Sequence, residues 1–208
     1  MELSSNSAGD IFYFTSLSEF FAGTDIYVHK VGSDGSIIWD NPINLTNAIA
    51  FDNRVIKAIP NPEEGSIVIY SEQASSSLNY ILSIDQDGNI IDGFPKRICD
   101  VDSNQSIQDV INVEGGVFIV WRDDRGFDAD LYGQIFDYSG NRIGPDEGIV
   151  IADYIGDQSG ASLAFNSDLN EVIIIDKKGN AEKVKKNSKK FIASIVARKI
   201  MNSFLDIK

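Results

Sequence analysis

The sequence has one cysteine and one histidine, and this scarcity excludes several kinds of site. Cys99 has no second cysteine for an intramolecular disulfide, and neither a CxxC pair nor a Cys/His cluster is present for zinc or iron. A Ser/His/Asp triad would have to be built on His29, and no G-x-S-x-G motif accompanies it. We therefore expect Cys99 to be a small buried side chain and His29 an ordinary strand residue, with no cofactor and no metal.

Long apolar runs and positive charge are also scarce in most of the chain. No stretch of 18 apolar residues is present to cross a bilayer as a helix. Residues 1–176 contain 8 Lys and Arg against 29 Asp and Glu, a net charge of −21. A segment with this much negative charge repels the phosphate backbone of nucleic acids, so we expect no nucleic-acid partner. Met1–Asp10 also lacks the basic and apolar segments of a secretion signal.

What the sequence does contain is an internal repeat of about fifty residues. Three glycines, each in a Ser-Gly or Asp-Gly turn that closes an apolar run, lie 53 and 52 residues apart. A tyrosine stands eight residues before each of them. The residues are Gly35, Gly88 and Gly140, with Tyr27, Tyr80 and Tyr132. Such turns supply the positive φ of a β-hairpin, so the register predicts the same hairpin three times.

Each repeat is predicted to carry four short β-strands. The apolar second strands are predicted at Ile11–Phe14, Ser66–Tyr70, Val117–Trp121 and Glu171–Asp176, and weaker strands precede them at Val55–Ile59, Asp109–Val113 and Ser162–Phe165. A fourth strand is expected after the turn glycine, at Ile37–Trp39 and Ile90–Ile91. The second strands are almost continuously apolar, which is typical of strands buried on both faces. We predict an all-β fold, an incomplete or small β-propeller-like array of about three to four four-stranded blades. The alternative is an immunoglobulin-like sandwich, which should show strict alternation and no such period.

One repeat resembles a known family. Trp121-Arg122-Asp123-Asp124-Arg125 is followed by Asp130-Leu131-Tyr132-Gly133-Gln134 and then by Asp137 and Gly140. This run is similar to the tandem blades of secreted bacterial propeller proteins, with the consensus W-x-D-x-R, then D-I-Y-A-Q, then D-x-x-G. Other repeats match at fewer positions, as at Asp25-Ile26-Tyr27. The resemblance implies a non-catalytic module, extracellular or in the cell envelope, often within a larger chain. The chain itself would be a fragment of a propeller, an open array or a four-bladed variant.

Carboxylates are abundant, but most are expected to cap turns. Asp123 or Asp130 is predicted to pair with Arg125 and fix a loop. Asp100, Asp102 and Asn104 imitate the start of a calcium loop, yet Gln105 replaces its glycine and Ile111 its glutamate. We therefore expect no calcium site there.

The function that these observations favour is a non-enzymatic repeat domain that binds or scaffolds a protein or glycan. The expected contacts are loop residues: Phe20, Phe21, Arg125 and Phe127. The alternative from another class is a carbohydrate-active propeller hydrolase. That alternative requires two carboxylates about 5–10 Å apart in a concave pocket.

The C-terminal segment differs from the rest. Residues 1–180 are expected to form the repeat domain, and residues 181–208 a basic amphipathic helical tail, helical from Ser188 to Asp206. From residue 177 onward 10 Lys and Arg stand against 2 Asp and Glu, a charge of +8. The tail is expected to fold back on the acidic repeats; the alternatives are binding to an anionic membrane surface, or disorder.

Overall fold

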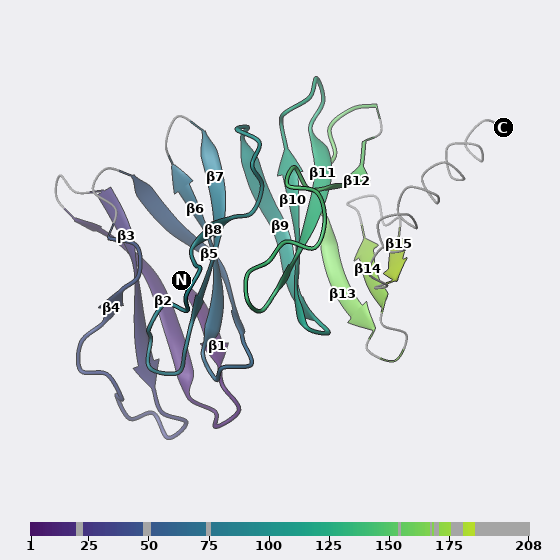
Figure 1. Cartoon of the computed structure of the whole chain (residues 1–208). Coiled ribbons are helices and arrows are strands. Elements are labelled where there is room, and N and C mark those ends of the chain that lie inside the picture. Colours follow the sequence, from purple (N-terminus) through teal and green to yellow (C-terminus); the bar gives the residue numbers. More distant parts are fainter. Residues whose placement is uncertain are drawn as a thin grey trace. The chain divides into compact units, whose positions relative to one another are not determined.

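The computed structural model describes residues 1–19, 23–47, 51–73, 76–153, 155–166, 168, 171–175 and 181–185. Within these ranges every regular element is a β-strand, which confirms the all-β prediction (Figure 1). No helix of the described part is long and apolar enough to span a membrane. The chain divides into two compact units, residues 1–106 with 138–140 and residues 107–137 with 141 onward. The predicted helix at 188–206 lies outside the described residues.

Unit 1 contains two repeats, each of four antiparallel strands. The first consists of β1 (Glu2–Ser5), β2 (Ile11–Glu19), β3 (Gly23–Val31) and β4 (Ile43–Asn44). The second consists of β5 (Asp52–Pro60), β6 (Ser66–Gln73), β7 (Ser77–Ile84) and β8 (Lys96–Arg97). In each repeat the strands pair in chain order, and a parallel bridge between Thr24 and Asp52 joins the two repeats.

Unit 2 contains most of the third repeat and what is described of the fourth. The third consists of β9 (Gln105–Val113), β10 (Gly116–Asp123), β11 (Asp130–Asp137) and β12 (Ile149–Ala152), paired in chain order. The fourth consists of β13 (Ser162–Asn166), β14 (Glu171–Ile175) and β15 (Ala181–Lys185). Strand β15 pairs with β14 along its whole length, so the fourth repeat continues into the segment that the sequence analysis assigned to the tail.

Strand register confirms the repeat. Tyr27, Tyr80 and Tyr132 all lie on the third strand of their repeats, and their partners on the second strand are Thr15, Tyr70 and Trp121. The turn glycines that follow have φ values of 86°, 84° and 77°. The left-handed conformation is the one that hairpin turns of this kind require. The fold is therefore a β-propeller-like array, as predicted.

The predicted positions of the fourth strand were wrong. Ile37 and Ile90 each form one isolated bridge, to Val31 and Ile84, and the paired outer strands come later, at β4 and β8. In the first repeat Trp39 then packs edge-on against Phe12, with ring centroids 5.9 Å apart. Burial of this large ring draws the chain off the sheet edge before it returns at β4.

The hydrophobic core of unit 1 is shared by its two repeats. Side chains from both repeats form one buried cluster: Phe12, Phe14, Ile26, Val28, Leu45, Ala58, Val68, Tyr70, Leu82 and Ile84. Full burial of each such side chain contributes about 1.5–3 kcal/mol. Neither sheet could bury these residues alone, so the two repeats stabilise each other.

The core of unit 2 is built in the same way from the third and fourth repeats. Its buried residues are Val113, Phe118, Val120, Leu131, Ile135, Ile149, Ile151, Ala152, Ala161, Val172 and Ile174. On β10 the residues of this cluster alternate with Val117, Ile119 and Trp121, which are also fully buried. The strand is therefore buried on both faces, as its continuous apolar run indicated.

The hairpin turn of the second repeat packs against the first repeat. A Cβ atom added at Gly88 would lie 2.5 Å from Ile43 Cδ1 and 2.8 Å from Trp39 Cη2. The buried Lys30 ammonium donates to the backbone carbonyl of Gln86 in the same turn, over 3.0 Å. Gly88 thus serves both the positive φ of the turn and the close approach of two repeats.

A matched pair of substitutions separates these two roles. Gly35 also has a positive φ, but a Cβ atom added there would meet no other atom within 4 Å. We therefore expect Gly35→Ala to lower the free energy of unfolding by about 1–2 kcal/mol, from backbone strain alone. Gly88→Ala should cost about 1–3 kcal/mol more, because it also overpacks the contact with Trp39 and Ile43. Urea denaturation of both variants measures the difference, and equal losses would mean that the turn makes no tight contact.

Candidate functional site

A concave pocket of about 200 Å³ lies in unit 1, at the end of the second repeat where the hairpin turns gather. Its lining combines two acidic side chains, one aromatic ring and several small polar groups. The residues are Asn61, Pro62, Glu63, Ser83, Ile91, Asp92, Tyr138 and Ser139. They come from three separate turns and from strand β7, so the fold brings together residues that are distant in sequence.

Asn61 holds the wall that carries Glu63. Its Nδ2 group donates to Ile84 O at 2.7 Å and to Ser83 Oγ at 3.0 Å, which ties the turn to β7. Its Oδ1 atom accepts from the backbone N–H groups of Glu63 and Gly65, each at 3.0 Å. Asn61 is therefore a positioning residue whose own polar atoms are used, whereas the Glu63 side chain is exposed to solvent.

A second turn of the lining carries Asp92. The Ile91 amide donates to Ser83 O at 2.9 Å, and the Phe94 amide donates back to Ile91 O at 3.2 Å. These bonds fix a tight turn on which the Asp92 side chain is exposed. The pocket thus presents two solvent-accessible carboxylates, those of Glu63 and Asp92, on backbone held in both turns.

Tyr138 supplies the aromatic group. It is half-buried, and burial raises the pKa of its phenol above the ordinary value of 10. The hydroxyl therefore stays protonated at neutral pH and can both donate and accept a hydrogen bond. Its ring adds to the apolar part of the lining, to which Pro62 and Ile91 also belong.

The charge of the pocket restricts its ligands. Its lining contains two carboxylates and no Lys, Arg or His. Phosphate, sulfate and uronate groups would be repelled, whereas neutral hydroxyl groups can donate to the carboxylates. The arrangement suits a small neutral polyol.

Arg125, one of the predicted contact residues, lies elsewhere and is largely buried. Its side chain is 17% exposed and pairs with Asp123, whose side chain is fully buried. Its Nη1 group donates to Glu147 O at 2.9 Å, and its guanidinium carbon lies 3.8 Å from the centre of the Tyr132 ring. The expected pairing with Asp123 is confirmed, and the role of Arg125 as a ligand contact stays a prediction.

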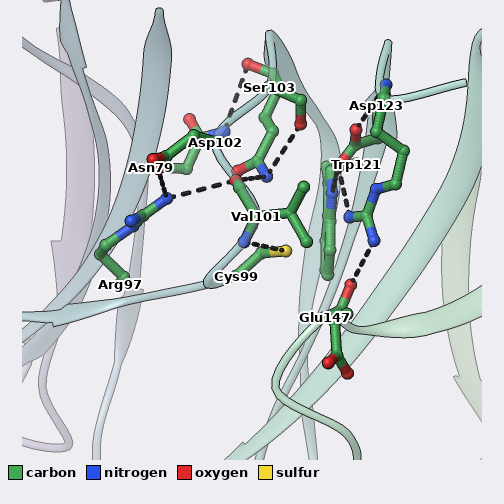
Figure 2. A network of polar contacts seen from close by, with 11 residues as sticks. Asn79, Arg97, Cys99, Val101, Asp102, Ser103, Trp121, Asp123 and Glu147 are labelled. Carbon is green, nitrogen blue, oxygen red and sulfur yellow. Dashed lines mark hydrogen bonds and ion pairs between the residues drawn. The ribbon is translucent and has the colours of Figure 1, made fainter.

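Asp123 is the centre of this cluster, in which Figure 2 labels Trp121, Asp123 and Glu147. Asp123 Oδ2 accepts from Trp121 Nε1 at 3.0 Å, and Oδ1 accepts from the Arg125 amide, also at 3.0 Å. With the guanidinium, three donors satisfy a carboxylate that has no access to water, which is the condition for burying such a charge. The cluster fixes the β10–β11 connection.

The other predicted contacts are scattered or not described. The Phe127 side chain is fully exposed and does not line the pocket. Phe20 and Phe21 lie outside the described residues. The sequence analysis missed Glu63, Asp92 and Tyr138, because each belongs to a turn whose polar residues were explained by turn formation alone. Only their convergence in space distinguishes them.

Two residues of the segment that resembles the start of a calcium loop interact with other residues of the chain. Asp102 forms an ion pair with Arg97 at 2.8 Å, visible in Figure 2, and Asn104 Oδ1 accepts from the Ser77 amide at 3.5 Å. Among the described residues no three His, Cys, Asp or Glu side chains are grouped so as to hold a metal ion. Cys99 is buried, as expected, and its Sγ atom accepts from the Val101 amide at 3.5 Å.

The solved structures to which this chain is distantly similar include two glycosidases. No protein-family model matches the chain, and no curated protein matches it. The endo-arabinase of Bacteroides thetaiotaomicron VPI-5482 is 12% identical with a TM-score of 0.48, over 88% of this chain and 72% of that one. The GH32 beta-fructofuranosidase BmSUC1 of Bombyx mori, in complex with sucrose, is 13% identical with a TM-score of 0.40, over 81% and 40%.

These comparisons correct one prediction. The sequence analysis expected a chain that is not an enzyme, whereas both similar structures are glycosidases by name. The non-enzymatic assignment is therefore withdrawn. At these scores the similarity transfers no residue role to this chain.

The Trp121 cluster gives a stability prediction. Trp121 is fully buried and stacks on Tyr132 with ring centroids 6.2 Å apart, so Trp121→Ala should cost about 3–5 kcal/mol. Trp39→Ala is the matched control: Trp39 is half-buried, and a smaller loss is expected. Thermal and urea unfolding measure both. A Trp121→Ala protein as stable as the wild type would mean that this ring is a surface contact.

Proposed function

We propose that this chain is a carbohydrate-active β-propeller domain that binds a neutral glycan in the pocket of unit 1. The observation that carries the proposal is the convergence of an aromatic ring with two exposed carboxylates in one pocket. Sugar rings have apolar C–H faces and polar hydroxyl edges. The Tyr138 ring matches the faces, and the Glu63 and Asp92 carboxylates match the edges.

The size of the pocket supports one sugar residue. Sites for drug-sized ligands usually enclose about 300–1,000 Å³. The volume of about 200 Å³ is smaller, so the terminal residue of a longer chain fits better than an internal segment. The ligand is neutral because the lining is acidic. Glycans of this kind occur on and outside cells, so we also propose an extracellular or cell-envelope location for the protein.

Hydrolysis is the second candidate, and the pair of carboxylates supports it. Glycoside hydrolases use one carboxyl group as a general acid and a second as nucleophile or base, about 5–10 Å apart. Glu63 and Asp92 line the same pocket and are the residues to which these roles would fall. Asn61 would keep Glu63 in place through its backbone amide.

The binding test uses neutral arabinan, fructan, glucan and mannan oligosaccharides, with a uronic-acid oligosaccharide as the anionic comparison. Calorimetry should detect a neutral ligand that Tyr138→Ala weakens at least tenfold, whereas Tyr138→Phe retains most of the affinity. Glu114→Gln is the matched control, since Glu114 is exposed on the β9–β10 turn, outside the pocket. Equal binding by Tyr138→Ala and wild type would place the glycan elsewhere, and no binding to any member would refute the proposal.

Hydrolysis is tested on whichever oligosaccharide binds. Release of reducing sugar should fall at least a hundredfold in Glu63→Gln and in Asp92→Asn, while the affinity changes much less. A wild-type protein that binds its ligand and releases no sugar would remove the second candidate and leave the first intact.

A further inference from the structure

The first repeat has two different faces. Side chains alternate across a strand, and those of one set, including Phe12, Phe14, Ile26 and Val28, point into the core of unit 1. The other set forms what we call the outer face of the first repeat. Its members include Leu3, Ile11, Tyr13, Leu17, His29 and Val31.

Part of the outer face is apolar and accessible, and Thr15, Asp25 and Tyr27 lie on the same face. Leu3 pairs with Tyr13 across β1 and β2, and Tyr13 pairs with His29 across β2 and β3, with ring centroids 6.1 Å apart. Ile11 lies beside Val31 in the same register. Leu3 is 53% exposed, Leu17 47% and Ile11 38%. A row of large apolar side chains on a sheet face is typical of an interaction surface.

The second repeat shows what covers such a face. When the two repeats are aligned at Tyr27 and Tyr80, Val68 is equivalent to Tyr13. In the same alignment Leu82 is equivalent to His29, and Ile84 to Val31. Val68, Leu82 and Ile84 are buried in the core that the second repeat shares with the first. In the second repeat, therefore, the equivalent face packs against the core face of a preceding repeat.

The fourth repeat also has a side that corresponds to the core-facing side of the first repeat. On β14, Val172 and Ile174 point into the core of unit 2, so Ile173 and Ile175 point to the opposite side. Ile175 is 41% exposed. By strand register this side of the fourth repeat corresponds to the side on which Phe12 and Phe14 lie in the first.

We propose that the outer face of the first repeat binds the exposed Ile173–Ile175 side of the fourth repeat of a second copy of this chain. Within each unit, the core-facing side of one repeat packs against the side of the next repeat that is equivalent to the outer face. The proposed contact repeats this arrangement between two copies. It is a heterologous, head-to-tail interface, in which each copy contributes a different surface.

The test uses three single variants at exposed positions: Leu17→Lys on the outer face, Ile175→Lys on the fourth repeat, and Phe127→Lys, fully exposed and on neither surface, as control. Sedimentation velocity across 1–100 µM should show association of the wild type and of Phe127→Lys. Leu17→Lys and Ile175→Lys should each be monomeric when alone. Circular dichroism and thermal melts confirm that all three fold.

Mixing separates head-to-tail association from other arrangements. Leu17→Lys retains an intact fourth repeat and Ile175→Lys an intact outer face, so an equimolar mixture should form a heterodimer through one native contact. If Ile175→Lys associates by itself as the wild type does, the outer face pairs with something other than the fourth repeat and the proposal fails. A wild type that is monomeric at every concentration also overturns it.

Discussion

The packing of one β-sheet face onto the next is the interaction on which the rest of the structure depends. Each repeat is a small sheet whose second strand is rich in apolar residues, so at least one of its faces must be covered by a neighbouring repeat. In unit 1, Phe12 and Phe14 of the first repeat are covered by the second, and Val68 and Leu82 of the second by the first. The turn glycines allow this contact to close, since any side chain at Gly88 would meet Trp39.

The candidate site is a consequence of the same packing. Hairpin turns are needed to return each strand, and stacked repeats gather those turns at one end. There the chain is free to place polar side chains without cost to the core, and in unit 1 it places Glu63, Asp92 and Tyr138 around one pocket. By contrast, the Trp121, Asp123 and Arg125 cluster is polar but closed, because each of its charges has a protein partner. The open pocket suits a ligand, and the closed cluster holds a loop.

Much of the fold could be predicted from the sequence, because each repeat is marked by residues that a local structure requires, such as a glycine at the positive φ of a hairpin turn. The turn glycines and the tyrosines eight residues before them fixed the register, and the apolar second strands were placed within a few residues. The outer strands β4 and β8 could not be placed, since each is two residues long and its position depends on where Trp39 and neighbouring side chains are buried. Strand β1 was missed because Glu2–Ser5 is short and has only one apolar residue, Leu3.

The site was harder to predict than the fold for a physical reason. Exposed aromatic and charged residues were sought within single loops, yet the pocket draws Glu63, Asp92 and Tyr138 from three turns up to 75 residues apart in the chain. Arg125 was expected to contact a ligand because it is a loop residue, and its guanidinium pairs with the buried Asp123. Residues that converge only after folding leave no local pattern in the sequence.

Tight face-to-face contact between neighbouring repeats can be measured by a double-mutant cycle on Gly88→Ala and Trp39→Ala. Trp39→Ala removes the ring that the new Cβ atom would meet at 2.8 Å, so Gly88→Ala should cost less in that background. We predict that the two free-energy changes deviate from additivity by at least about 1 kcal/mol. Changes that add to within about 0.3–0.5 kcal/mol would show that the repeats do not touch there and would contradict the account.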